Sequence, residues 1–186
     1  MSRAVFIKGK SVDLVCLTKA DAQAVHRWSS DMEIIFNWGG QPFPADLKAI
    51  EDRLESQHKQ KNCLMLGIQL STEDKLIGMG GLSYIEWPWQ RAELTMCIGQ
   101  QEHQGKGHGR EVTTLILEHA FTKLNLHSVM LRVTSYNDRG IKCYDACGFQ
   151  PAGKRRESRI DGDKFYDVLF MDILADEFRS RKAPAG

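Results

Sequence analysis

The sequence predicts an α+β domain in which one mixed, mostly antiparallel sheet packs against helices. Segments follow each other in the order strand, two helices, three strands, helix, strand, helix, two strands. Short connections separate the three central strands, which predicts an antiparallel meander. Asp161-Gly162 lies between the last two strands, and this dipeptide is typical of a hairpin turn. We expect one domain over residues 1–178, followed by a flexible tail over 179–186 that is charged and then rich in Pro and Ala.

The first part of the chain predicts a strand and two helices separated by a loop. Residues 12–17 are largely apolar, as expected for a buried strand, and a shorter strand-like stretch precedes them. Thr18 and Asp21 have the spacing of a capping box, so we expect a helix to begin there. Residues 31–43 are expected to form a loop because they contain a Gly-Gly pair and a proline. A second helix is expected from about residue 44.

The remaining elements follow from apolar periodicity and from their end signals. Val112, Leu115 and Ile116 recur at helical spacing, which predicts a long helix. A shorter helix is expected between Asn137, a good N-terminal cap, and Gly148, a good C-terminal end. Strands are expected over residues 63–70, 76–86, 91–98, 128–134, 149–159 and 164–174.

The turn between the strand at 91–98 and the long helix has the sequence Gln104-Gly105-Lys106-Gly107-His108-Gly109. Glycines allow a ligand to approach the backbone, and the free amides and positive end of the helix attract an anion. A nucleotide triphosphate loop is excluded because no Lys-Ser or Lys-Thr follows the glycines, and a dinucleotide fingerprint is excluded because Arg110 replaces its third glycine. The turn therefore predicts a phosphate site of another kind, with a plain chain reversal as the alternative.

Composition excludes several classes of protein. The net charge of +1 and pI near 7.7 give no support for a nucleic-acid or membrane-surface partner. No transmembrane run or signal peptide is expected, so we predict a cytoplasmic protein. The five cysteines are expected to be free thiols, and the six histidines have no ligand spacing, so no metal is predicted.

Two motifs resemble those of a known family. Gln104-x-x-Gly107-x-Gly109 resembles the Arg/Gln-x-x-Gly-x-Gly/Ala signature of the GNAT superfamily of acyl-CoA N-acyltransferases. Asn137, Tyr144 and the Gly148-Phe149 pair resemble its Asn-x-x-Ala-x-x-x-Tyr-x-x-x-Gly-Phe run, with Gly140 in place of Ala. The order of elements is GNAT-like through essentially the whole chain. The C-terminal pattern over 161–174 looks like the branch of ribosomal-protein N-terminal acetyltransferases and spermidine N-acetyltransferases.

The resemblance implies that acetyl-CoA is the co-substrate and that it binds in a cleft around residues 97–110. In that family the amides of the glycine turn hold the pyrophosphate, and strand amides contact the pantetheine arm and the thioester oxygen. The residues expected to contact the coenzyme are Cys97, Ile98, Gly99, Gln104, Gly105, Lys106, Gly107, His108, Gly109, Arg110, Asn137, Lys142 and Tyr144. Arg139 is a further cation that could neutralise phosphate.

The implied chemistry needs an acid and a base. By resemblance, Tyr144 donates a proton to the thiolate leaving group, with a space-filling core tyrosine as the alternative. Glu93 is the candidate base, and its alternative is a solvated residue or an ion pair with Arg91 or a cross-strand base. Proton transfer from a lysine-like ammonium to an ordinary carboxylate is uphill by roughly 8 kcal/mol. A base of this type would therefore need an altered environment or a relaying water.

The acceptor is expected to bind among the first two helices, their loop and the Trp87-Pro88-Trp89 turn. The candidate contacts are Glu33, Trp38, Phe43, Trp87 and Trp89. The aromatic residues could instead be core, and the acidic loop could simply be solvated.

The resulting function is an acetyl-CoA-dependent N-acetyltransferase that moves an acetyl group to a primary amine, on a protein N-terminus or a small molecule, by direct transfer in a ternary complex. The alternatives are a polyamine or aminoglycoside acetyltransferase and a non-catalytic acyl-CoA or small-cation sensor. A homodimer is left open as a further partner.

Overall fold

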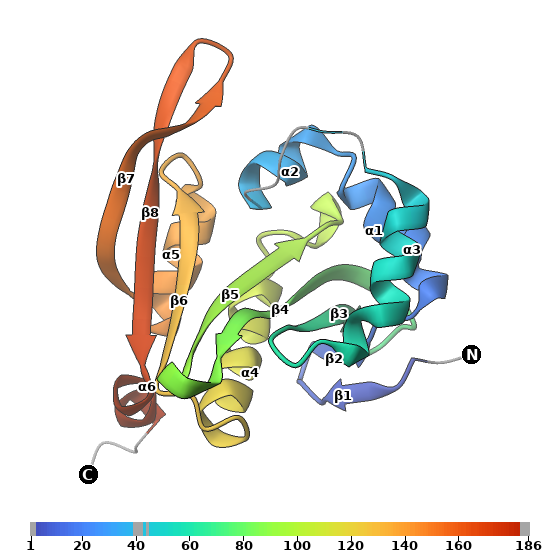
Figure 1. Ribbon diagram of the computed structural model, residues 1–186, viewed down its shortest axis with the longest axis horizontal. Helices are drawn as coiled ribbons and strands as arrows, with labels where there is room; N and C mark the ends of the chain where they lie inside the picture. The colour runs from blue at the N-terminus through green and yellow to red at the C-terminus, as the bar shows by residue number, and fades with distance from the viewer. Residues whose placement is uncertain (1–2, 39–42, 44, 183–186) are drawn as a thin grey trace.

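The computed structural model describes residues 3–38, 43 and 45–182, and these contain one eight-stranded sheet in the order β1-β2-β3-β4-β5-β6-β8-β7 (Figure 1). Its strands are β1 (Val5–Ile7), β2 (Val12–Cys16), β3 (Leu64–Leu70), β4 (Leu76–Glu86), β5 (Arg91–Ile98), β6 (Ser128–Thr134), β7 (Gln150–Asp161) and β8 (Lys164–Leu174). All neighbouring strands are antiparallel except β5 and β6, which are parallel. The predicted mixed, mostly antiparallel sheet is confirmed.

Helices cover both faces of the sheet. The α-helices are α1 (Ala22–Trp28), α2 (Met32–Trp38), α3 (Leu47–Ser56), α4 (His108–Thr122), α5 (Asp138–Cys147) and α6 (Ala175–Lys182). Short 3-10 turns are η1 (Lys19–Asp21), η2 (Gln57–Lys59), η3 (Trp87–Trp89) and η4 (Gln101–His103). No helix of the described residues is long and apolar enough to cross a membrane.

Two apolar clusters hold the helices to the sheet. Leu14 of β2 lies in one cluster and Val15 lies in the other, because successive side chains of a strand point to opposite faces of the sheet. The first cluster contains the buried face of α4, including Phe121, and the second contains residues of α1, α2 and α3, including Trp28. The central strands are therefore covered on both sides, as their near-continuous apolar sequence requires.

The expected loop between the first two helices is corrected. Its residues 32–38 form α2, because the Asp31 carboxylate accepts hydrogen bonds from the amides of Glu33 and Ile34 and caps the helix. The Gly-Gly pair that suggested the loop lies outside the described residues.

Two element boundaries also differ from the sequence-based predictions. The helix expected from about residue 44 begins at Leu47, because the Asp46 side chain accepts from the Lys48 amide and caps α3 there. The expected flexible tail is helical over residues 179–182, which belong to α6, and the rest of that tail lies outside the described residues.

Candidate active site

The site begins where β5 and β6 separate. These two strands pair over only three positions, from Arg91 opposite Ser128 to Glu93 opposite Met130, and then diverge (Figure 1). On the other edge of β5, pairing with β4 continues to Ile98. The second half of β5 therefore has one edge that is paired with β4 and one edge that faces the opening toward β6.

Hydrogen bonds at the end of β5 show which amides face the opening. The Gly99 amide donates to the Ile77 carbonyl at 2.8 Å, so it points toward β4. The Ile98 carbonyl accepts from Gln104 Nε2 at 2.8 Å, so residue 98 points the other way. Because alternate residues of a strand present their amides to opposite edges, the amides of Met96 and Ile98 face the opening.

The glycine turn continues directly from this strand end. Gly105 and Gly107 have φ values of +73° and +87°, in the left-handed region that favours glycine. A Cβ atom added to either residue would meet no atom within 4 Å, so the space above the turn is open. The Gln104 amide donates to the Gln101 carbonyl at 3.0 Å, and the next amide with a backbone acceptor is that of Glu111, which donates to the Gly107 carbonyl at 3.1 Å. The amides of residues 105–110 thus have no backbone acceptor in the described part of the chain, which suits an anion.

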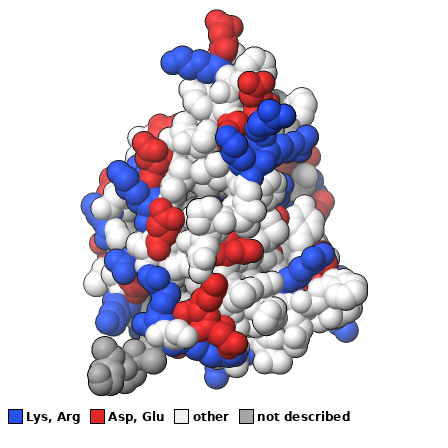
Figure 2. Space-filling model, turned by 90° about the vertical axis from the view of Figure 1, so that its left-hand side faces the viewer, with Lys and Arg blue, Asp and Glu red and all other residues white. Residues whose placement is uncertain are grey.

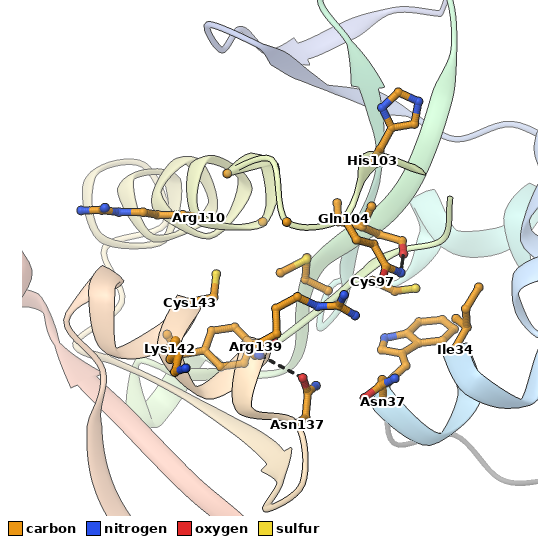
Figure 3. A pocket seen from close by; sticks show the side chains of 18 of the residues that line it. Ile34, Asn37, Cys97, His103, Gln104, Arg110, Asn137, Arg139, Lys142 and Cys143 are labelled. Atoms are coloured by element: carbon orange, nitrogen blue, oxygen red, sulfur yellow. Dashed lines mark hydrogen bonds between the residues drawn. The ribbon is translucent and has the colours of Figure 1, made fainter. Parts of the chain in front are cut away.

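A cavity of about 310 Å³ lies beside this turn, and we call it the loop-side cavity (Figure 3). It is bounded by α2, the end of β5, the turn at 103–110 and the first turns of α5. Arg110, Arg139 and Lys142 contribute positive charge to its lining, and Figure 3 shows Arg139 reaching into it while Arg110 extends along α4. Open glycines, free amides and three cations are the features that fit the diphosphate of a coenzyme A.

Some residues predicted to contact the coenzyme have other roles. The Gly99 prediction is corrected, because its amide is used by β4 and its Cα packs against the Trp28 indole, where a Cβ would come within 2.4 Å. The side chain of His108 lies outside the cavity lining and is buried against Ser11, with 3.1 Å between Nδ1 and Oγ. Lys106 is exposed and also lies outside the lining. Backbone contacts by Lys106 and His108 stay predictions.

Asn137 begins α5 as predicted, and its side-chain oxygen accepts from the Gly140 amide at 2.9 Å. The amide group lies so close to Gly140 that a Cβ there would come within 2.8 Å of Asn137 Nδ2. This contact gives a physical reason for glycine at position 140. Both residues line the loop-side cavity, together with Cys97, Ile98, Gln104, Gly105, Gly107 and Gly109.

Tyr144 occupies the boundary between the loop-side cavity and a second cavity. The second cavity, of about 610 Å³, lies between β5, β6, β7, α2 and α3, and we call it the hairpin-side cavity. Asn37, Trp38, Met96 and Tyr144 line both cavities. Burial raises the pKa of the Tyr144 phenol above its ordinary value, so it stays protonated and available as a donor at neutral pH. Its ring packs edge-on against Phe149, with centroids 5.9 Å apart.

Glu93 lines the hairpin-side cavity, but it forms an ion pair. Its Oε1 atom lies 2.7 Å from Nε of Arg132 on β6, while Arg91 pairs with Glu86. The cross-strand partner considered from the sequence is therefore present in the structure. The Glu93 carboxylate is therefore engaged by Arg132, and its role as a base stays a prediction.

The residues predicted to contact the acceptor fall into two groups. Trp38 lies at the junction of the two cavities, and its Nε1 atom donates to Thr95 Oγ1 at 2.9 Å. Glu33 lines the loop-side cavity, and its carboxylate accepts a hydrogen bond from the Gln101 side chain. Phe43 lies in a separate hollow beside α3 and is 73% exposed.

Trp87 and Trp89 lie outside the linings of both cavities. They belong to η3, directly before the start of β5, and neither contributes to the loop-side or the hairpin-side cavity. The Trp87 indole donates to the Lys61 carbonyl at 2.8 Å. Their contact with the acceptor stays a prediction.

Cys97, Cys143 and His103 are the thiols and the imidazole in the lining of the loop-side cavity. All five cysteines are free, and burial raises the pKa of the Cys97 thiol to about 12, so it is neutral. Among the described residues, no group of three His, Cys, Asp or Glu side chains is placed to hold a metal ion. The absence of a metal stays a prediction.

Sequence reasoning missed Asn37, Thr95 and Met96 as cavity residues. Asn37 lies in the segment predicted as a loop, so its position on a helix facing the opening could not be seen. Thr95 and Met96 belong to the strand that was predicted, and its alternation was the available signal.

The chain matches a known protein family and several of its members. Residues 12–150 match the model described as "Acetyltransferase (GNAT) domain". A spermidine N(1)-acetyltransferase of Vibrio cholerae is 29% identical over 168 residues, which cover 90% of this chain and 95% of that protein. A spermidine N(1)-acetyltransferase of Escherichia coli K12 is 23% identical over 95% of this chain and 92% of its own length.

Solved structures agree with the sequence comparison. The crystal structure of the Vibrio cholerae spermidine N-acetyltransferase in complex with CoA and spermine has a TM-score of 0.82 and 26% identity, covering 91% of this chain and 98% of that one. The chain is therefore a member of the GNAT family of acetyltransferases.

Proposed function

We propose that this chain transfers the acetyl group of acetyl-CoA directly to a primary amine in a ternary complex, with Tyr144 as the general acid. The observation that carries the proposal is the position of Tyr144 in the shared wall of the two cavities. A donor in the loop-side cavity and an acceptor in the hairpin-side cavity would meet beside its hydroxyl. The Vibrio cholerae enzyme has been solved in complex with both CoA and spermine, which supports a site with two ligands.

The proposed chemistry is a direct displacement. The neutral amine attacks the thioester carbonyl carbon, and an amide on the open edge of β5, from Met96 or Ile98, donates to the oxygen as it becomes negative. The C–S bond then breaks, and the phenol of Tyr144 donates its proton to the departing sulfur. The extra proton of the amine leaves to solvent, directly or through a water beside Glu93.

The acceptor must be deprotonated before it attacks. A lysine-like amine is almost wholly protonated at pH 7, and forming the free amine costs about 4 to 5 kcal/mol. Polyamines are the acceptor class that the named relatives support, and protein N-termini and aminoglycosides are the others considered.

The test is a thiol-release assay with acetyl-CoA against these amine classes, run on wild type and Tyr144→Phe. The phenylalanine ring keeps the packing against Phe149, so coenzyme A should bind with unchanged affinity in calorimetry while kcat falls by about 10²- to 10⁴-fold. Tyr84→Phe is the control, because this tyrosine is exposed and lies outside both cavities. Unchanged turnover in Tyr144→Phe would remove the general-acid role.

The pH profile gives a second readout of the same role. Since burial raises the pKa of Tyr144, the phenol stays protonated through the ordinary assay range. The rate should therefore rise as the acceptor amine deprotonates and should show no falling limb between pH 7 and about 10. A descending limb in that range in wild type, absent from Tyr144→Phe, would mean that the tyrosine ionises there and that its environment was misjudged.

A further inference from the structure

The hairpin-side cavity is lined by an unusual set of charges. Arg53 of α3, Arg132 of β6 and both Arg155 and Arg159 of β7 line it, and Glu93 is the one acidic residue of its lining in the described part of the chain. Four arginines and one glutamate give a formal charge of +3. Figure 2 shows Lys and Arg side chains gathered below the tip of the β7–β8 hairpin. Lys154, Arg155, Arg156 and Arg159 belong to β7.

Two of the four arginines lie outside the ion pairs of the described residues. Glu93 is paired with Arg132 at 2.7 Å, so its carboxylate is already engaged. Arg53 and Arg155 have no carboxylate within ion-pair distance among the described residues. On the neighbouring strand β8, Asp167 is paired with Lys154.

We infer that the acceptor of this enzyme is an anionic primary amine, one that carries a carboxylate or phosphate group besides its amino group. This inference rests on the proposed acetyl transfer and names the substrate class of the same site. An arginine offers a fixed pair of donors that matches a carboxylate or phosphate, and such charge-assisted hydrogen bonds are among the strong ones. A polyamine, with several positive charges, would instead enter a cavity of its own sign.

The rest of the lining fits such a molecule. Ser83, Thr95 and Ser158 offer hydroxyl groups, and Leu94, Val168 and Phe170 offer apolar contact. The volume of about 610 Å³ lies within the range of small-molecule sites. The amino group would approach the opening of β5 beside Tyr144, while the anionic end would lie toward Arg53 and Arg155.

The experiment compares amines with and without a negatively charged group. One arm uses 6-aminohexanoate against 6-aminohexanamide, which tests a carboxylate. The other uses O-phosphoethanolamine against ethanolamine, which tests a phosphate. Spermidine and putrescine are measured beside them. The anionic member of at least one pair should have kcat/KM about tenfold or more above its neutral partner, as expected for one charge-assisted hydrogen bond.

Variants test whether the named arginines cause the preference. Arg155→Gln and Arg53→Gln should each reduce the ratio of anionic to neutral kcat/KM by about tenfold. Arg156→Gln is the matched control, because Arg156 is exposed on the same strand and does not line the cavity. Added salt should raise KM for the anionic amine and lower it for spermidine, since screening weakens both attraction and repulsion.

Two results would overturn the inference. The first is that spermidine has the highest kcat/KM of the amines. The second is that the ratio of anionic to neutral kcat/KM stays near one in both pairs, in wild type and in every variant. In either case acetyl transfer, and hence the proposed function, would stand. Calorimetric binding of the same amines to the coenzyme A complex covers the case of no turnover. Binding of an anionic amine that is lost in Arg155→Gln would support the inference without catalysis, and equal or absent binding across both pairs would reject it.

Discussion

Replacing Gly107 by alanine tests whether the glycine turn at residues 104–109 binds a phosphate or only reverses the chain. Gly107 has φ +87°, and a Cβ there would project into open space, where the structure places the free amides of the turn. Alanine in the left-handed region costs about 1–2 kcal/mol of stability. If the methyl group also keeps a phosphate oxygen from one amide, the lost charge-assisted hydrogen bond is worth about 1.5–3 kcal/mol, and Kd for coenzyme A should rise by roughly 10- to 150-fold.

Gly162→Ala is the matched control for this change. Gly162, in the turn between β7 and β8, also has a left-handed φ of +58° and nothing within 4 Å of an added Cβ, so its backbone cost should be similar. Both variants should lose comparable stability in urea unfolding, but only Gly107→Ala should lose coenzyme affinity in calorimetry. Equal coenzyme affinity in the two folded variants would refute phosphate binding by the glycine turn and would leave it as a chain reversal.

Two further changes test how the site is supported. Trp38→Phe removes the hydrogen bond between Trp38 on α2 and Thr95 on β5, so the free energy of unfolding should fall by about 1 kcal/mol and KM for the acceptor should rise. Thr95→Val should reproduce much of this loss of stability. If the losses of the two single variants add in the double variant, the hydrogen bond contributes nothing. His108→Gln tests the pH dependence of stability. Burial, together with the charges of His103 and Lys106, lowers the pKa of His108 below its ordinary value of 6.5. The unfolded chain therefore binds this proton more readily than the folded chain, and the free energy of unfolding should fall as pH drops below about 6.5. The variant should show a shallower fall in denaturant unfolding between pH 7.5 and 5.5, and an unchanged slope would contradict the role of His108.

The sequence was most informative where chemistry and backbone geometry depend on neighbouring residues. Gly105 and Gly107 occupy left-handed conformations in the turn that was predicted, and Asn137 caps the helix it was expected to begin. Such features are local, because a glycine or a capping side chain acts within a few residues of its own position. The strands were also predicted closely, since their alternation depends on adjacent residues.

Predictions failed where position depends on distant parts of the chain. The helix α2 was missed because glycine and proline after it outweighed the Asp31 cap in the pattern, although the cap and burial of Ile34 decide the structure. The sequence also left open whether Glu93 is solvated or ion-paired, because its partner Arg132 on β6 lies 39 positions away.

The two cavities are lined by different parts of the chain, so the charge of one can change without a change in the other. Arg110, Arg139 and Lys142, which surround the loop-side cavity, belong to α4 and α5. The charges of the hairpin-side cavity come from α3, β5, β6 and β7, and only the residues at the junction belong to both. Substitutions in α3 or β7 can therefore change the charge of the hairpin-side cavity without altering the glycine turn or Tyr144. The named relatives support a polyamine as the acceptor, whereas the inferred anionic acceptor rests on the charge of this chain's own cavity, and the matched amines decide between the two.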